Sequence, residues 1–188
     1  MSLDCNSFYY ENGTTGFLGG IISCASDEFN IQMYNSGVRY VSFDADIFYI
    51  GENNEITFEN SIKNRMKSFW YGAASPGDTT DIDKLIDSSH FKLKKSHETK
   101  LSDIITKMCS GINGVDLEKL IIEAKEFETS IQYYLYKPIT IYNLPYEDNK
   151  SIYECNSIIS RCYTYTIFDI VLVEYDEYII LLVIGSDE

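Results

Sequence analysis

Two apolar runs near the C-terminus constrain the fold more than any other feature of this sequence. Residues 163–174 and 178–184 flank the short polar segment Tyr175-Asp176-Glu177, a pattern that predicts a β-hairpin. The arms are apolar at successive positions over residues 170–173 and 179–184. A strand without a polar face must be covered on both sides. We therefore expect this hairpin at the centre of a sheet, with helices packed on one side of it.

Short apolar stretches separated by Gly, Asn and Asp fill the first third of the chain and predict a meander of hairpins over residues 1–58. Gly37 is suited to the left-handed position of one three-residue hairpin loop. Asp44-Ala45-Asp46 is expected to form a polar corner between two strands. The expected strands of this region cover residues 7–10, 17–24, 30–34, 38–43, 47–50 and 56–58.

The spacing of hydrophobic residues changes from two to about 3.6 in the middle of the chain, which predicts about four helices over residues 59–137. Start signals place these helices at Asn60 or Ser61, after Thr80 in a capping box with Asp83, after Ser96, and after Asp116. Strands are expected again over residues 138–188, beginning with a short one at 139–142. The sequence therefore predicts a single α+β domain, residues 1–188, with an antiparallel sheet.

Negative charge is concentrated in the two ends of the chain. Residues 1–59 contain nine acidic residues and one basic residue, and residues 138–188 contain nine acidic and two basic residues. The middle is nearly neutral, with eleven acidic and twelve basic residues, and the whole chain carries a formal net charge of −14. Twelve of the 16 tyrosines also lie in the two acidic segments. Carboxylates beside tyrosine rings are typical of surfaces that recognise cationic partners.

This distribution predicts an acidic, non-enzymatic binding protein whose partner is a basic protein, in the manner of an immunity or inhibitor protein. The physical mechanism would be occlusion, with carboxylates taking the place of phosphates and tyrosines adding contact area. If folding brings both ends into one sheet, loops and strand ends from each would form the partner-binding surface. The expected partner-binding residues are Asp44, Asp46, Glu52, Glu55, Tyr146, Glu147, Asp148, Tyr175, Asp176 and Glu177.

A metal-dependent hydrolase is an alternative. Asp44-Ala45-Asp46 follows the apolar run Val41-Ser42-Phe43 and resembles the first motif of the haloacid dehalogenase-type phosphatases, which implies Mg²⁺ binding and attack on phosphate. Gly77-Asp78 with Asp83 resembles the acidic metal motif of the same family. Against this resemblance, residues 47–50 continue as a strand where the family has a turn, and the segment between the two motifs is too short for alternating strands and helices. A polar strand corner is the favoured interpretation.

A second cluster of possible metal ligands consists of Asp78, Asp81, Asp83, Asp87 and His90. These side chains have the chemistry of divalent-cation ligands. Acidic residues at the start of a helix also stabilise its dipole without any metal, and this capping interpretation is favoured. A third alternative is a small-ligand or structural module in which the charge has no specific role.

Charge, apolar run length and cysteine spacing further limit the expected ligand class and cellular location. The low pI, near 4.5, argues against direct nucleic-acid binding, and the longest apolar run is too short to cross a membrane. Five cysteines without a C-x-x-C pair, and no signal peptide, predict reduced thiols and a cytoplasmic location. No cofactor-binding motif is recognised. A homodimer through an exposed strand edge stays open.

Overall fold

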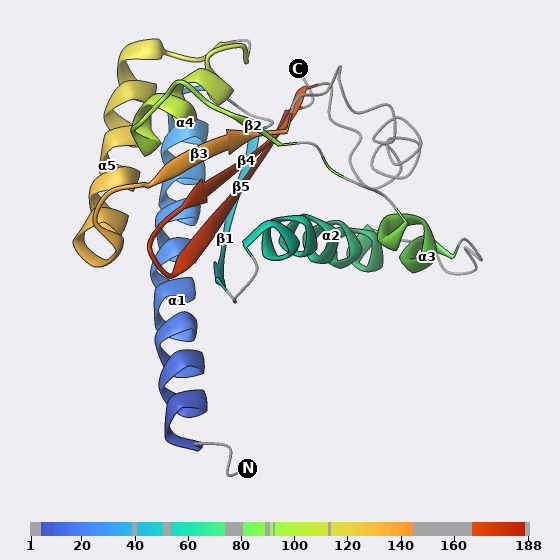
Figure 1. Ribbon diagram of the computed structural model, residues 1–188. Helices are drawn as coiled ribbons and strands as arrows, with labels where there is room; N and C mark the ends of the chain where they lie inside the picture. Colours follow the sequence, from blue (N-terminus) through green and yellow to red (C-terminus); the bar gives the residue numbers. More distant parts are fainter. Residues whose placement is uncertain are drawn as a thin grey trace.

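In the computed structural model, a five-stranded antiparallel sheet lies between two groups of helices (Figure 1). The structure describes residues 5–38, 41–50, 54–73, 81–88, 91, 93–112, 114–144 and 167–186. The strands are β1 (Val41–Tyr49), β2 (Lys94–Lys95), β3 (Thr140–Asn143), β4 (Ile167–Glu174) and β5 (Tyr178–Ser186). Their order across the sheet is β1-β5-β4-β3-β2, with antiparallel pairing throughout. The predicted α+β class is confirmed.

The C-terminal hairpin lies at the centre of this sheet, as predicted. β4 and β5 pair from Ile167↔Ser186 to Glu174↔Ile179. The two edges are β1 and the short lysine strand β2. Leu172 and Leu181 pack into one hydrophobic cluster, whereas Val173 and Ile180 pack into another on the opposite face of the hairpin. The apolar arms are therefore covered on both sides.

Helices cover both faces of the sheet, so the prediction that they pack on one side is wrong. The first face is covered by α1 (Cys5–Asn35), α4 (Leu101–Cys109) and α5 (Leu117–Leu135). The second face is covered by α2 (Asn54–Ala73) and α3 (Ile82–Asp87), which lie on the other side in Figure 1. A hairpin without a polar face requires this two-sided burial. None of the described helices has the length and hydrophobicity that a membrane crossing requires.

The N-terminal hairpins are replaced by α1, a helix of 31 residues. Its buried residues Leu18, Ile22, Phe29 and Met33 recur at helical spacing and join the cluster on the first face. The glycines of this segment suggested turns, but they lie inside the helix, and at Gly19 the helix passes close to Ile47 of β1. Tertiary packing has overridden local propensity here.

Gly37 ends this helix instead of forming a hairpin loop. Its φ angle is +98°, in the left-handed region that glycine adopts without a steric penalty. The Val38 N–H donates to the Met33 carbonyl at 3.1 Å, the long-range bond of a Schellman motif. Both side chains are buried, which is the hydrophobic contact that usually accompanies this motif.

The second region that differs from prediction is the segment around Asp44-Ala45-Asp46. These residues lie in the middle of β1, which runs without a corner from Val41 to Tyr49 and pairs along its whole length with β5. Residues 56–58 are not a strand, because α2 begins at Asn54. The predicted strand 139–142 and the four helices of the middle segment are confirmed, with changes at their starts.

The caps of these helices are partly as predicted. Asp116 caps α5 by accepting from the N–H groups of Glu118 and Lys119. Asp81 caps α3 in place of Thr80, which lies outside the described residues. Ser96 does not cap α4. Instead, the side chain of Glu128 in α5, which is only 7% exposed, accepts a hydrogen bond from the Leu101 N–H at 3.1 Å. It thereby pairs one of the N–H groups at the start of α4 that lack a partner within the helix.

Candidate functional site: an acidic groove at the edge of the sheet

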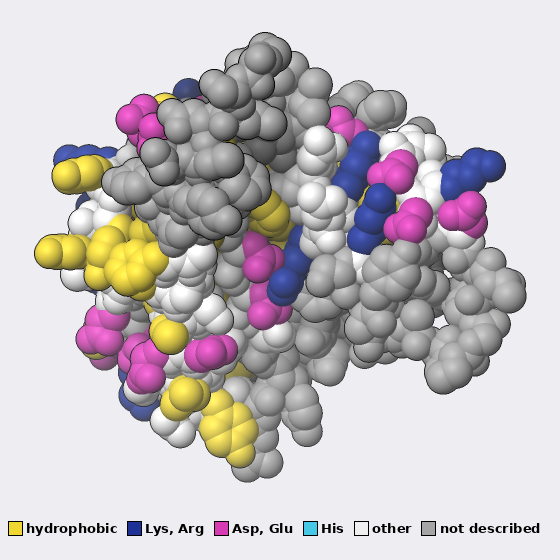
Figure 2. All heavy atoms as spheres, turned by 90° about the horizontal axis from the view of Figure 1, so that it is seen from below, with side chains coloured by type: hydrophobic (Ala, Val, Ile, Leu, Met, Phe, Trp, Pro, Cys, Tyr) yellow, Lys and Arg dark blue, Asp and Glu magenta, His cyan; other side chains and the backbone are white. Residues whose placement is uncertain are grey.

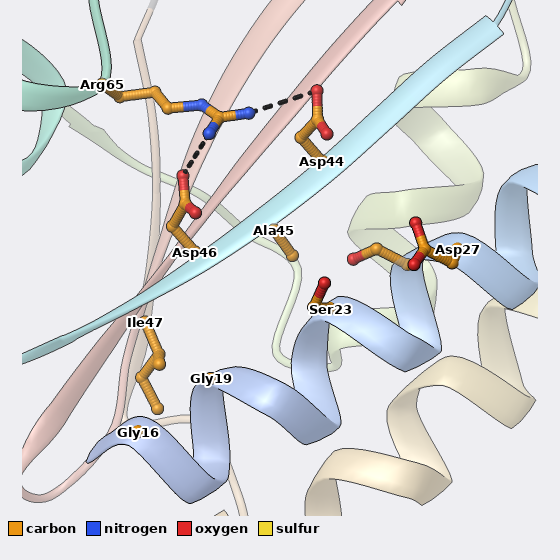
Figure 3. A pocket seen from close by; sticks show the side chains of 10 residues that line it. Gly16, Gly19, Ser23, Asp27, Asp44, Ala45, Asp46, Ile47 and Arg65 are labelled. Atoms are coloured by element: carbon orange, nitrogen blue, oxygen red, sulfur yellow. Dashed lines mark ion pairs between the residues drawn. The ribbon is translucent and has the colours of Figure 1, made fainter. Parts of the chain in front are cut away.

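Arg65 of α2 holds together the two aspartates that the sequence analysis had singled out. Its Nη2 lies 3.2 Å from Asp44 Oδ2, and its Nη1 lies 3.0 Å from Asp46 Oδ2 (Figure 3). The guanidinium therefore bridges the two carboxylates, an arrangement for which its planar fork of donors is well suited. The three side chains are 20–38% exposed, so the bridge lies at the surface.

Strand alternation explains this arrangement. Phe43, Ala45 and Ile47 pack toward the α1 face of the sheet. Asp44 and Asp46 project to the opposite face, as every second residue of a strand must. Arg65 comes from α2 on that face. The carboxylates are thus positioned by β1 and partly neutralised by α2.

A hollow of about 380 Å³ lies at this edge of the sheet, between α1, β1 and Arg65 (Figure 3). This volume is in the lower part of the range for small ligand sites. Asp27 of α1 adds a third carboxylate and has no ion-pair partner among the described residues. The lining residues are Gly16, Gly19, Ser23, Ser26, Asp27, Asp44, Ala45, Asp46, Ile47 and Arg65.

Small residues of α1 create the space. Gly16, Gly19, Ser23 and Asp27 follow each other at intervals of three or four, so they share one side of the helix. A Cβ on Gly19 would lie 3.7 Å from Ile47 Cγ2, which shows how closely the helix passes the strand. These residues were not among the predicted site residues, because the segment was expected to form hairpins. Their helical spacing is the signal that could have revealed them.

Ser26 also lines the hollow and is buried, with 5% of its surface exposed. Its hydroxyl has no hydrogen-bond partner in the described part of the chain. A buried hydroxyl that forms no hydrogen bond costs free energy. A ligand that occupied the hollow and paired with this hydroxyl would recover that cost.

The electrostatics of the groove are set by crowded carboxylates. Burial raises the pKa of Asp46, Arg65 opposes this change, and the nearby Asp44 carboxylate adds to it. With one arginine and three aspartates, the lining has an excess of two negative charges when all are ionised. The groove is therefore suited to a cationic ligand.

The other predicted partner-binding residues are distributed differently. Asp176 and Glu177 are exposed in the β4–β5 turn, at the end of β1, where the Ile50 N–H donates to the Glu177 carbonyl at 2.8 Å. Tyr175 is 1% exposed, so its ring is not available to a partner in this conformation. The Tyr175 side chain faces the core because the β4–β5 turn begins only at Asp176. Glu55 lies in α2, and Glu52, Tyr146, Glu147 and Asp148 lie outside the described residues.

The residues of the metal-site alternatives have other partners. Asp44 and Asp46 are bridged by Arg65, Asp81 caps α3, and Asp83 and Asp87 lie 3.8 and 2.8 Å from Lys67 Nζ. Asp78 and His90 lie outside the described residues. Within the described part of the chain, no group of three or more His, Cys, Asp or Glu side chains could hold a metal ion.

A second hollow, of about 310 Å³, lies on the α2 side of the sheet. Its lining is mostly aromatic and aliphatic, and the ring of Phe58 lies 5.2 Å from that of Tyr142. This hollow has the character expected of the small-ligand alternative, but it lacks the concentration of charge found at the β1 edge. Its lining residues are Phe58, Glu59, Phe91, Leu93 and Tyr142.

The surface view shows how charge differs between the two sides of the molecule. Basic and acidic side chains alternate over the side that carries α2 and α3, at the right of Figure 2. On the opposite side, acidic and some basic side chains lie among exposed hydrophobic ones. Exposed aromatic side chains also occur on α1 and α5, namely Phe17, Tyr133 and Tyr134, and the Phe17 and Tyr134 rings lie 5.6 Å apart.

Comparison with known proteins adds no family to this description. No protein-family model, no curated protein and no solved structure matches the chain. The function must therefore be argued from the site itself.

Proposed function

We propose that this chain is a non-enzymatic binding protein that engages a basic protein through the groove between α1 and β1. It would act as an immunity or inhibitor protein does, by covering the cationic surface of its partner, and a cytoplasmic location is part of this proposal. The observation that carries the proposal is the composition of the groove. Three carboxylates, a single arginine and a buried unpaired hydroxyl surround one hollow.

Arg65 has a defined place in this proposal. Its guanidinium already occupies part of the carboxylate surface, so it imitates the cation that a partner would supply. A partner cation would then share or replace the contacts of Arg65. Removing Arg65 should increase the attraction of the groove for basic ligands, whereas removing a carboxylate should decrease it.

The test is capture of partners from lysate of the host organism at low and high salt, using the wild-type chain and three variants as bait. Asp27→Asn removes an exposed carboxylate without changing side-chain shape, and we expect its affinity for the captured protein to fall about two- to fivefold at low salt. Arg65→Gln is expected to raise the affinity. Asp103→Asn, an exposed acid on α4, is the matched control and should behave as wild type.

The proposal requires a basic protein that elutes as salt rises and whose capture follows this order of variants. Equal capture by the wild type, Asp27→Asn and Arg65→Gln would contradict it. So would a thermal shift with Mg²⁺, Mn²⁺ or Zn²⁺ that disappears in Asp44→Asn, because this result would support the hydrolase alternative instead.

A further inference from the structure

We propose that the partner contributes an extended basic segment that pairs as an additional strand with the outer edge of β1, at Ala45 and Ile47. This inference rests on the proposed function and specifies how the groove is occupied. Among the described strands β1 is an edge strand, with β5 on one side and no described strand on the other. Strand addition to such an edge is an established mode of peptide recognition.

The hydrogen bonds at the ends of β1 show which residues face outward. The Phe43 N–H donates to Asn30 Oδ1 at 2.8 Å, and Asn30 Nδ2 donates to the Phe43 carbonyl at 2.7 Å. At the other end, the Ile50 N–H faces the β4–β5 turn. Outward and inward residues alternate along an antiparallel strand. Ala45 and Ile47 therefore present their backbone groups outward, as Phe43 does.

Asn30 also shows what chemistry this edge accepts. Its side-chain amide gives Phe43 one donor and one acceptor, as the backbone of a neighbouring strand would. At the next two outward positions, α1 presents serine and glycine in place of an amide, and the hollow begins. No described residue pairs with the outward groups of Ala45 and Ile47.

An extended peptide satisfies all of these groups together. A lysine or arginine side chain alone offers donors only, so it would leave the outward N–H of Ala45 unpaired. A peptide backbone offers donors and acceptors in alternation. Its side chains would point to both sides of the sheet, where Asp27 lies on the α1 side and Asp44 and Asp46 lie on the α2 side. Charge on both sides therefore favours a basic sequence.

The test uses the full chain and a synthetic seven-residue peptide of alternating lysine and valine. Calorimetric titration would compare the parent peptide with versions N-methylated at one position at a time, since N-methylation removes a backbone donor and leaves the charge unchanged. We expect a periodic result in which methylation at every second residue weakens binding about tenfold. Methylation at the intervening residues is expected to change binding less than about threefold. A peptide of alternating D- and L-residues with the same composition is the control.

Ala45→Pro provides a second test from the side of the protein. Proline removes the outward N–H and fixes φ at about −65°, and edge strands tolerate it at such positions. We expect β1–β5 pairing to survive, as judged by an unchanged circular dichroism spectrum, and peptide affinity to fall about tenfold or more. Asp103→Asn, which lies outside the groove, is the control and should bind the peptide as the wild type does. If Ala45→Pro fails to fold, the N-methylation series alone decides.

The outcomes separate this inference from the proposed function. If Asp27→Asn weakens peptide binding but N-methylation has equal effects at all positions, strand addition is wrong and the acidic groove remains. If Asp27→Asn has no effect, both proposals fail. Dimerisation of the chain that Ala45→Pro abolishes, without peptide binding by the wild type, would identify a second copy as the occupant and overturn the basic-partner inference.

Discussion

The two faces of the sheet differ in how their carboxylates are compensated. On the α2–α3 face, Asp44, Asp46, Glu59, Asp83 and Asp87 lie between 2.8 and 3.8 Å from a lysine or arginine nitrogen. On the α1–α5 side, Glu98 and Asp116 also lie 2.9 and 3.9 Å from a lysine nitrogen, but no described cation pairs with Asp27, Glu28, Glu123 or Glu126. Burial raises the pKa of Glu123, and repulsion from Glu126 and Glu28 raises it further.

Under the proposed function, this difference indicates where a basic partner would bind most favourably. Carboxylates that already pair with a lysine or arginine of the chain gain little from an external cation. Uncompensated carboxylates repel each other in the isolated protein, and a basic partner would relieve that repulsion. The groove at β1 lies between the two faces and combines both conditions, with Asp44 and Asp46 compensated and Asp27 uncompensated.

The first prediction asks whether the two faces also differ in packing. Phe43 is fully buried on the α1–α5 face, with ring centroids 4.6 Å from Phe29 and 5.2 Å from Phe127. We expect Phe43→Ala to lower the free energy of unfolding by about 3–5 kcal/mol. Ile62→Ala, on the α2–α3 face, should cost about 2–5 kcal/mol. Urea denaturation measures both.

Tyr133→Ala is the control for these variants, since Tyr133 is 81% exposed and should change stability by less than about 0.5 kcal/mol. A small cost for either core variant would mean that the faces differ in packing as well as in charge. The difference between the α1–α5 and α2–α3 faces could then no longer be explained by charge alone.

The second prediction concerns Asp169, a partly buried acid on β4. Burial raises its pKa to about 6 from the ordinary 3.8, although the Ile170 N–H and Lys107 oppose this change. The folded protein therefore holds this proton more tightly than the unfolded chain. It follows that the free energy of unfolding falls as pH rises from about 4 to about 6.

Asp169→Asn should remove that pH dependence and raise stability at pH 7 by about 1–3 kcal/mol, since one pKa unit corresponds to about 1.4 kcal/mol. Thermal melts at several pH values would measure the effect. An unchanged slope in the variant would show that another group is responsible.

The third prediction concerns Tyr136, which follows α5 with φ +57° and ψ −124°. Such angles are unfavourable for any residue except glycine and cost about 1–3 kcal/mol. The ring is 80% exposed, so no burial compensates for this strain. We expect Tyr136→Gly to raise the free energy of unfolding by about 1 kcal/mol, and Tyr136→Phe to leave it unchanged. A destabilised glycine variant would contradict this account of the strain.

The smallest expected effects come from variants that remove one charge on each face of the sheet. Lys67→Gln removes the cation near Asp83 and Asp87, so it should lower stability by a few tenths of a kcal/mol. Glu123→Gln removes one of several repelling acids, so it should raise stability by a similar amount. Both differences should shrink in high salt. The same sign for both variants would contradict the charge comparison between the two faces.

The sequence predicted the elements whose signals are local. The α5 helix has a clear hydrophobic period and Asp116 as its cap, and the central hairpin has two apolar arms around a polar turn. The first third failed because glycines inside α1 resembled turn residues, while the spacing of Leu18, Ile22, Phe29 and Met33 was not recognised as helical. Local propensity and tertiary packing disagreed there, and packing prevailed.

The site was predicted in part. Asp44 and Asp46 were identified as acids, but Arg65 could not be paired with them because that contact depends on the placement of α2 across the sheet. Ser26 and Asn30 matter only through their position beside β1. Neither the hollow nor the outward edge of β1 can be recognised before α1 is known to be a helix.

The most direct test of the central claim is amide hydrogen exchange at β1, followed by NMR with and without the alternating lysine–valine peptide. We predict that the peptide slows exchange at Ala45 and Ile47, because their outward N–H groups gain partners. Phe43, already paired with Asn30, should change little. Exchange at Ala45 and Ile47 that stays the same in the presence of saturating peptide would contradict strand addition at this edge.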